Sequence, residues 1–336
     1  MNRKVLAAAA MLTVAGGAAQ AQQMVFTSWG GTTQDAQTEF WAAPFSEKTG
    51  TAVVQDGPTD YGKIKAMVEA DATNWDVVDV EFDWALQAGN QGLLEPLDFT
   101  VIDKASLDPR FVSDYAVGSF YYSFVMGWNE ANFPDAKPAT LADLFDTAKF
   151  PGKRTFYKWS APGVIEAALL ADGVAPDQLY PLDLDRAFAK LDTIKPDIIW
   201  WEGGAQSQQL LASGEAPVGF FWNGRLAALA ADGMPVGISW ENNITAADAL
   251  VVPKGAPNKD AAMAFIAEAT SAQAQADFAA NTGYAPINTG SADLMDAEIR
   301  KTLPDSQTAT QINADMAYWA EHRDEIGTRW YAWQAE

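Results

Sequence analysis

The densest group of chemically active side chains is an acidic cluster formed by Asp76, Asp79, Glu81 and Asp83. Paired carboxylates can act as general acid and base, and clustered carboxylates can hold a metal ion. Alternate residues of a strand point to opposite faces, however, and Asp83 is well placed to cap a following helix. The calcium-loop pattern with its central glycine and terminal glutamate is missing. We therefore interpret most of this cluster as helix caps and solvated edges.

The side chains that most enzyme mechanisms need are scarce. The chain has no cysteine, and its one histidine, His322, lies in a polar C-terminal stretch where a solvated side chain is expected. The sequence contains no G-x-S-x-G, H-E-x-x-H, Walker A or G-x-G-x-x-G motif. We therefore predict a binding protein with no catalytic residue, metal or cofactor. A periplasmic hydrolase or lyase stays open as an alternative from another class.

Tryptophan is abundant, with 13 residues in the chain. Four of them lie at or just after the ends of predicted strands, namely Trp29, Trp84, Trp222 and Trp240. Ligands of open α/β sheets bind beyond the carboxyl ends of the strands. An indole face attracts an organic cation by roughly 0.5 to 2 kcal/mol. Packing is the commoner role for any single tryptophan, but the set together predicts an aromatic ligand cage.

Strand and helix patterns alternate along the chain, which is typical of sheets covered on both faces. The first set has strands at 25–29, 52–55 and 75–80, with helices capped by Thr32 or Thr33 and by Asp60. An extended segment, 119–128, leads into strands at 153–157, 198–201, 218–222 and 236–240, with helices starting near Thr140, Gly163, Asp183 and Ala205. A strand-like 249–253 precedes helices capped by Asn258 and Ser271. Because 336 residues exceed the roughly 250 to 300 that one core organises, we expect two α/β domains.

The first 21 residues have the pattern of a cleavable signal peptide. Arg3 and Lys4 precede a short apolar run, and Ala19-Gln20-Ala21 forms a small-residue cleavage site. The apolar run is too short to span a bilayer, and no later stretch is apolar enough to do so. We expect cleavage after Ala21. Without a cysteine there is no lipid anchor or disulfide, so we expect a free periplasmic protein.

The chain is strongly acidic, with a formal charge of −22 that becomes −24 once Arg3 and Lys4 are removed. Such a field repels nucleic acid and anionic lipid and attracts cations. We therefore expect no nucleic-acid partner. Solubility alone is the competing explanation for the charge.

Several motifs occur in a fixed order over nearly the whole mature chain. They are Phe26-Thr27-Ser28-Trp29-Gly30-Gly31, Phe45 to Gly50, Trp75-Asp76-Val77-Val78, Gly92 to Leu97, Phe221-Trp222-Asn223-Gly224, Asp248 to Asn258, and Gly283-Tyr284-Ala285-Pro286. In this order they resemble the spermidine/putrescine-type periplasmic binding proteins of ABC importers, an extracellular solute-binding family.

The resemblance implies an α/β, type II periplasmic-binding-protein fold with two hinge-linked lobes, each a mainly parallel sheet flanked by helices. We place lobe 1 at 22–125 plus 248–300 and lobe 2 at 126–247 plus 301–336. The implied partners are a small-molecule ligand in the interlobe cleft and an ABC permease in the inner membrane. We expect a monomer.

The resemblance also implies positions for ligand-binding residues. Trp29 matches the first-loop aromatic, Asp248 the carboxylate that meets an amine, and Tyr284 a late pocket tyrosine, while Trp240 is a candidate for a further stacking tryptophan. Together with the helix starts and strand ends, these give a predicted ligand site of Trp29, Gly30, Gly31, Glu81, Trp84, Ser160, Gln206, Ser207, Trp222, Trp240, Asp248 and Tyr284.

The chain departs from the polyamine-binding pattern at two places. Polyamine binders usually place acidic residues just after the first-loop tryptophan and at a second-lobe helix start, where this chain has Gly30-Gly31 and Ser160 to Gly163. Gln206 and Ser207, with Arg225 nearby, suit a carboxylate instead.

We therefore predict capture of a polyamine-like solute or other organic amine, with a zwitterionic betaine or opine-like amino acid as the alternative. Three acidic residues elsewhere could restore the missing charge, namely Glu81, Glu166 and Glu202. A ferric-iron binder is a further alternative. Strand alternation weakens it, because it sends the adjacent Tyr121 and Tyr122 to opposite faces.

Overall fold

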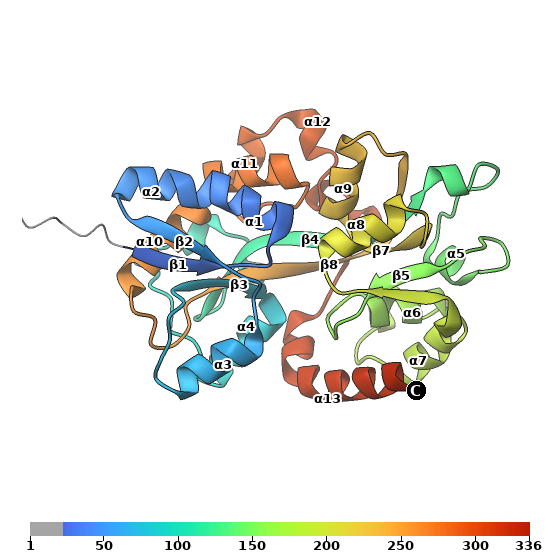
Figure 1. Cartoon of the computed structure of the whole chain (residues 1–336), viewed down its shortest axis with the longest axis horizontal. Helices are drawn as coiled ribbons and strands as arrows, with labels where there is room; N and C mark the ends of the chain where they lie inside the picture. The colour runs from blue at the N-terminus through green and yellow to red at the C-terminus, as the bar shows by residue number, and fades with distance from the viewer. Residues whose placement is uncertain (1–22) are drawn as a thin grey trace, which may run out of the picture.

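The computed structural model describes residues 23–336, so the expected signal peptide lies outside the described residues. Strands and helices alternate along the chain (Figure 1). The strands are β1 (Gln23–Thr27), β2 (Ala52–Asp56), β3 (Val77–Glu81), β4 (Ala116–Asn129), β5 (Arg154–Tyr157), β6 (Ile198–Trp201), β7 (Val218–Trp222), β8 (Val236–Val251) and β9 (Ile312–Asn313). The helices are α1 (Gly31–Gln37), α2 (Ala43–Thr49), α3 (Tyr61–Glu69), α4 (Phe82–Asn90), α5 (Leu141–Phe145), α6 (Val164–Ala171), α7 (Leu184–Asp192), α8 (Gly204–Ala212), α9 (Asn223–Ala231), α10 (Lys259–Ala269), α11 (Ala272–Thr282), α12 (Ala297–Arg300) and α13 (Met316–Ala335).

The strands form one mixed sheet in the order β2-β1-β3-β8-β4-β7-β5-β6, with β9 paired to β8. The outer strands of each half pair in parallel, as β2-β1-β3 and as β7-β5-β6. The two central strands, β4 and β8, run antiparallel to each other and to their other neighbours β7 and β3. The expected α/β fold is confirmed; its parallel pairs are those of the outer strands and the short pair of β8 with β9.

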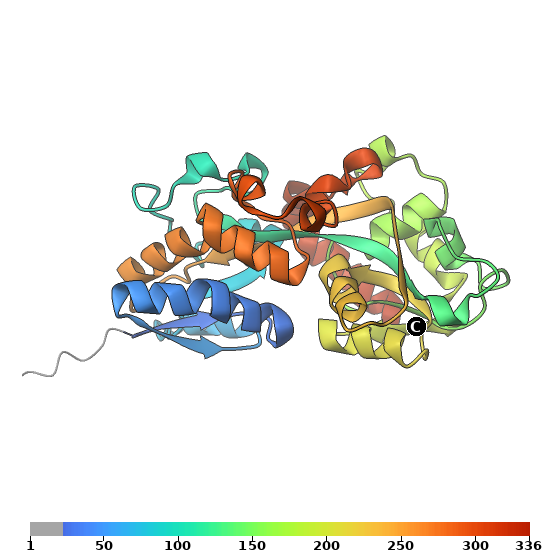
Figure 2. The ribbon, with the colours of Figure 1, turned by 90° about the horizontal axis from the view of Figure 1, so that it is seen from above.

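The molecule has two lobes (Figures 1 and 2). We call the part around β1 to β3, with α1 to α4, α10 and α11, the first lobe. The part around β5 to β7, with α5 to α9, is the second lobe. The long strands β4 and β8 pass from one lobe to the other (Figure 2). The proposed boundaries at 125/126 and 247/248 fall inside these two strands, so the division of the chain stays a prediction.

Strand β8 joins two segments that the sequence pattern separates, 236–240 and 249–253. Its pairing with β4 shifts register between Phe124, opposite Ile244, and Met126, opposite Ser239. Asn242, inside the extra residues, has a φ of 51°, a left-handed conformation that asparagine tolerates better than most residues. A bulge therefore interrupts the apolar pattern of one continuous crossing strand.

Two of the expected helix caps, Asp60 and Ser271, are present, and the helices expected near Thr140 and Asp183 begin there with caps. Side chains accept a backbone N–H of the first turn at Asp60, Thr140, Asp183 and Ser271. Three expected caps are absent. Asp83 lies inside the first turn of α4 and pairs with Arg323. Helix α1 begins after Gly30, whose φ is 75°, and neither Thr32 nor Thr33 caps it. Asn258 precedes α10 but makes no side-chain cap, because its amide donates to Asp76 instead.

The acidic cluster is buried, which corrects the expectation of caps and solvated edges. Asp76 accepts the backbone N–H groups of Val25 and Asn258, and so ties β1 to the start of α10. Asp79 accepts hydrogen bonds from Ser28, Gln37 and Ser119. Buried carboxylates are tolerated when donors satisfy them, and these donors come from segments far away in the sequence.

The longer helices of both lobes bury part of their side chains in the protein core. In the part of the chain from 23 to 336, no helix has the length and apolarity needed to cross a membrane.

Candidate functional site

A small cavity lies between the two lobes. Residues of both lobes line it, namely Trp29, Thr33, Glu81, Phe120, Tyr122, Tyr157, Trp222, Arg225, Asp248 and Tyr284. A wider cleft shares five of these residues: Trp29, Glu81, Tyr157, Trp222 and Arg225.

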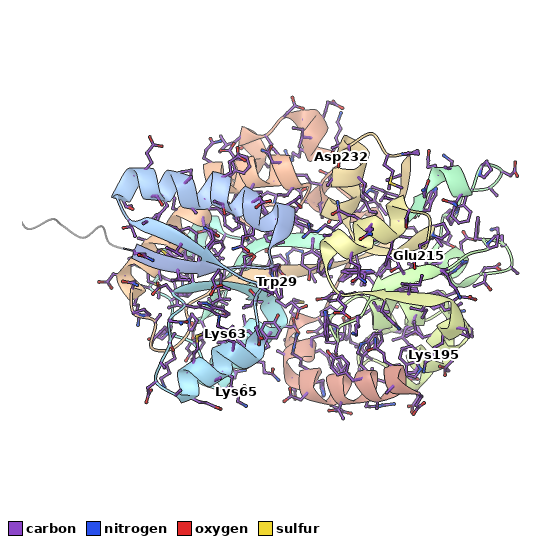
Figure 3. All side chains as sticks on the ribbon, in the orientation of Figure 1. Trp29, Lys63, Lys65, Lys195, Glu215 and Asp232 are labelled. Atoms are coloured by element: carbon purple, nitrogen blue, oxygen red, sulfur yellow. The ribbon has the colours of Figure 1, made fainter. Side chains whose placement is uncertain are left out.

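Strand ends supply much of the lining. Trp29 follows β1, Glu81 ends β3, Tyr157 ends β5 and Trp222 ends β7. The carboxyl ends of parallel strands meet at one edge of a sheet, where ligands of α/β proteins bind. Trp29 accordingly lies where the two lobes face each other (Figure 3).

The crossing strands supply the floor. Asp248 of β8 is paired in register with Glu81 of β3 on one side and with Phe120 of β4 on the other. Tyr122 lies two residues beyond Phe120 and therefore on the same face of β4. The phenyl ring of Phe120 stacks on Tyr284 at 4.9 Å between centroids. The sheet register thus sets two carboxylates beside an aromatic wall.

These carboxylates have unusual proton affinities. Burial raises the pKa of Asp248 well above its ordinary value, and repulsion from Asp79 and Glu81 raises it further. Burial also raises the pKa of Glu81, against the attraction of Arg323. Asp79, behind the cavity, has a pKa raised to about 7 by burial. A ligand that brought a positive charge would stabilise the ionised form of Asp248.

Arg225 of α9 provides the positive charge on the opposite side. Its Nη1 donates to the Thr32 hydroxyl at 2.8 Å, and its Nη2 donates to the Thr33 hydroxyl at 2.9 Å, both across the lobe interface. Within residues 23–336, the buried Nε of Arg225 and the indole N–H of Trp222 have no hydrogen-bond acceptor. Unsatisfied buried donors are costly, so both would gain from an acceptor on a ligand.

Gly204, the first residue of α8, makes room for the guanidinium. A Cβ built at this glycine would approach Cδ of Arg225 to 2.8 Å and would lie closer still to Nε and Cζ. No other side chain is compatible with the present position of Arg225. The start of α8 therefore contributes to the site because Gly204 has no side chain and leaves space for the guanidinium of Arg225.

Six predicted residues lie at the cavity or the cleft. Trp29, Glu81, Trp222, Asp248 and Tyr284 line the cavity, and Ser160 lines the wider cleft. Gly30 and Gly31 form the positive-φ turn between Trp29 and α1, and a Cβ at Gly31 would lie 3.9 Å from Nη1 of Arg225. Their ligand contacts stay a prediction.

Gly30 and Gly31 line neither space, and neither do four other predicted residues, which we withdraw from the candidate site because they have other contacts. Trp84 is buried and stacks on Tyr61 at 4.3 Å. Trp240 lies at the bulge of β8 and packs against a small separate core cluster. Gln206 accepts the backbone N–H of Glu202 at 2.8 Å, and the hydroxyl of the buried Ser207 donates to the Gly204 carbonyl.

The acidic residues that were candidates for restoring charge differ in position. Only Glu81 lines the cavity. Glu166 is buried in the second lobe, where it accepts hydrogen bonds from Gly163, Tyr180 and Trp319. Glu202 lies at the wider cleft and pairs with the ammonium of Lys158 at 2.5 Å.

Sequence reasoning omitted five lining residues: Thr33, Phe120, Tyr122, Tyr157 and Arg225. Tyr157 could have been found, because it ends a predicted strand like Trp222 does. Phe120 and Tyr122 needed the register of β4 against β8, which no local pattern gives. Arg225 was noted as a partner for a carboxylate but was not placed in the site.

The two-lobed α/β fold with its interlobe cavity defines a class, the substrate-binding proteins of ABC transporters. The model of the family described as "Bacterial extracellular solute-binding protein" matches residues 41–306. The chain belongs to this family. Solute-binding proteins of ABC importers bind a small ligand and deliver it to a membrane permease; the family and the relatives found are not enzymes.

Particular relatives are similar over nearly their full length. The gamma-aminobutyric acid-binding protein of Pseudomonas aeruginosa is 35% identical over 326 residues, which cover 94% of this chain and 92% of that protein. The solved structure of the GABA receptor Atu4243 has 72% identity and a TM-score of 0.89, covering 94% of this chain and 98% of that one. AgtB from A. tumefaciens R10, solved in complex with agropinic acid, has 32% identity and a TM-score of 0.87, covering 94% of this chain and 99% of that one.

The resemblance to polyamine binders is confirmed at greater distance. The spermidine/putrescine-binding periplasmic protein of Salmonella typhimurium is 23% identical over 286 residues, covering 80% of each chain. Among residues 23–336, no group of three or more His, Asp or Glu side chains is arranged to hold a metal ion.

Proposed function

We propose that the chain captures a short zwitterionic amino acid, with γ-aminobutyric acid as the leading ligand, and delivers it to an ABC permease. Its ammonium group lies toward Asp248 and Glu81, and its carboxylate lies toward Arg225. Trp29, Trp222 and Tyr284 enclose the alkyl chain between these charges. The protein does this as a periplasmic binding protein and performs no chemical step on the ligand.

The observation that carries this proposal is the opposition of charges in one small cavity. Glu81 ends β3 of the first lobe, and Asp248 lies beside it on the crossing strand β8, whereas Arg225 comes from the second lobe. A ligand with one charge of each sign at its two ends can bridge them with charge-assisted hydrogen bonds. Such bridging also favours closure, because each end is held by a different lobe.

The same observation favours a zwitterion over a diamine. A diamine needs a negative anchor at both ends, and the second-lobe side of the cavity presents Arg225 instead. A buried cation next to a second ammonium group would cost several kcal/mol through like-charge repulsion and desolvation. The names of the 35% and 72% identical relatives support the same choice, since both proteins are named for γ-aminobutyric acid. The polyamine-like ligand therefore has less support than its alternative.

Two further alternatives have no supporting geometry in the described part of the chain. Ferric iron would require several convergent deprotonated ligands, and burial raises the pKa of all three tyrosines at the cavity, Tyr122, Tyr157 and Tyr284. A hydrolase or lyase would require a base aimed at a bound substrate. We further propose that the protein is a monomer that does not bind nucleic acid, in keeping with its acidic charge.

A matched ligand panel tests the proposal. γ-Aminobutyric acid carries an ammonium group at one end and a carboxylate at the other. Butyrate has only the carboxylate, 1-aminobutane has only one ammonium group, and putrescine has an ammonium group at each end. At a hundredfold excess over its dissociation constant, a ligand of the folded state adds about 2.7 kcal/mol of stability. That corresponds to an increase of about 5 °C in melting temperature for a chain of this size. We expect this shift with γ-aminobutyric acid and weaker binding of the other three in isothermal titration calorimetry. Tighter binding of putrescine would reject the proposal.

A further inference from the structure

The C-terminal helix α13 is anchored on the second lobe. The indole of Trp319 donates to the buried Glu166 at 2.7 Å, and the indole of Trp330 donates to the Lys158 carbonyl at 2.7 Å. Trp333 donates to Asp192 at 2.8 Å. These contacts fix one side of the helix, and its other side contacts α4 of the first lobe (Figure 1).

One arginine of α13 crosses to the first lobe. Nη2 of Arg323 donates to Glu81 at 2.5 Å, and Nη1 forms an ion pair with Asp83. All three side chains are nearly shielded from water, with exposed fractions of 12% for Arg323, 8% for Glu81 and 0% for Asp83. The Tyr61 hydroxyl donates to the same Glu81 oxygen at 3.0 Å, and the guanidinium lies 5.5 Å from the Tyr61 ring centroid. Arg323 therefore neutralises a carboxylate that lines the cavity.

The charge balance of the cavity depends on this contact. Glu81 and Asp248 line the cavity, and the buried Asp83 follows Glu81 by two residues. Arg323 offsets Glu81 and Asp83 together, which leaves Asp248 as the carboxylate without a cationic partner. If Arg323 were neutral, both carboxylates of the cavity, Glu81 and Asp248, would lack a cationic partner. Because Glu81 also lines the wider cleft, a free Glu81 would offer a second ammonium group an anchor on that side, without approach to Arg225.

We propose that Arg323 is a specificity-determining positioning residue: by occupying Glu81 it sets the cavity for a ligand with one ammonium group and disfavours diamines. Arg323 acts through Glu81 and lies at the edge of the wider cleft, where it does not need to touch the ligand. This inference rests on the proposed function for the identity of the preferred ligand. It concerns a residue more than two hundred positions away from Glu81 in the sequence.

Arg323→Gln tests the inference, and Arg329→Gln is its matched control. Arg329 lies on the same helix and pairs with Asp185, but this pair is exposed and does not line the cavity. Dissociation constants for γ-aminobutyric acid and putrescine are measured by isothermal titration calorimetry in the mature protein and both variants. We expect Arg323→Gln to raise putrescine affinity about tenfold or more relative to γ-aminobutyric acid, a factor expected from removal of one nearby charge. Arg329→Gln keeps the ratio of the unmodified protein.

A second variant guards against misfolding, because Arg323→Gln leaves Asp83 buried without its partner. The double variant Asp83→Asn/Arg323→Gln removes this unpaired charge and still frees Glu81, so the same rise in putrescine affinity is expected. An equal loss of affinity for both ligands, or an unchanged ratio in both variants, overturns the inference. If the unmodified protein does not bind γ-aminobutyric acid, the proposed function fails. In that case the role of Arg323 is judged from putrescine alone: a higher affinity of Arg323→Gln than of the unmodified protein supports it, and an equal or lower affinity overturns it.

Discussion

Adding one methyl group at Gly204 is expected to weaken ligand binding without unfolding the protein. Ordinary contacts to a Cβ begin at 3.4 Å, so Cδ of Arg225, at 2.8 Å, must retreat by about 0.6 Å, and the guanidinium by more. The guanidinium is the far end of a flexible side chain and can move. Gly204 is the first residue of α8, where alanine is a better helix former than glycine. The strain therefore acts on the position of Arg225.

The size of the effect follows from the contact that is lost. A retreat of this size disturbs the hydrogen bonds from Arg225 to Thr32 and Thr33, which are 2.8 and 2.9 Å long. It also withdraws the guanidinium from the ligand carboxylate. A hydrogen bond to a charged group contributes about 1.5 to 3 kcal/mol, which corresponds to a roughly 10- to 150-fold higher Kd.

The adjacent glycine provides the control. A Cβ at Gly203 would have no atom within 4 Å, and the backbone there is extended. Calorimetric titration with γ-aminobutyric acid should give the unmodified Kd for Gly203→Ala and the weakened Kd for Gly204→Ala, with similar melting temperatures for both apo proteins. Equal affinity of the two variants would refute the role assigned to Arg225.

Three further predictions concern the carboxylates. Asp248→Asn should raise the Kd for γ-aminobutyric acid by about 10- to 150-fold in calorimetry, whereas Asp277→Asn, at a half-buried residue of α11 outside the cavity, should not; equal effects would contradict the ammonium site. Because the pKa of Asp248 is raised and an ammonium group needs its ionised form, affinity should fall as pH is lowered through that raised pKa, with proton release on binding. Calorimetry in buffers of different ionisation enthalpy measures that release, and its absence would count against Asp248. Asp79 has a folded pKa of about 7, so its contribution to stability is full below an unfolded pKa of about 3.9 and is lost as pH rises through 7. Asp79→Asn should therefore flatten the decline in urea-unfolding free energy between pH 5 and pH 8 by on the order of 1 to 4 kcal/mol, and an unchanged slope would contradict this assignment.

Local sequence patterns predicted the parts of the fold that local chemistry determines. The outer strands are short apolar runs between turn residues, and Asp60, Thr140, Asp183 and Ser271 cap helices through contacts within a few residues. Trp29 and Trp222 were predictable as cavity residues, because ligands of α/β sheets bind at the carboxyl ends of the strands and both tryptophans occupy such ends.

Residues whose role depends on distant partners were predicted less well. Asp79 reads as a solvated edge in the sequence, because its donors Gln37 and Ser119 come from separate segments. Trp240 was misplaced because its predicted strand continues past a register shift into β8, and its side chain packs against a separate core cluster. Arg323 gives no local signal at all, since its importance arises from the packing of α13 between the lobes.

A crystal structure of the mature protein with bound γ-aminobutyric acid tests the central claim most directly. We expect the ligand inside the interlobe cavity, with its carboxylate against Arg225 and the Trp222 indole N–H, and its ammonium group against Asp248. A ligand bound in the reverse orientation, or bound outside the cavity, would contradict the account.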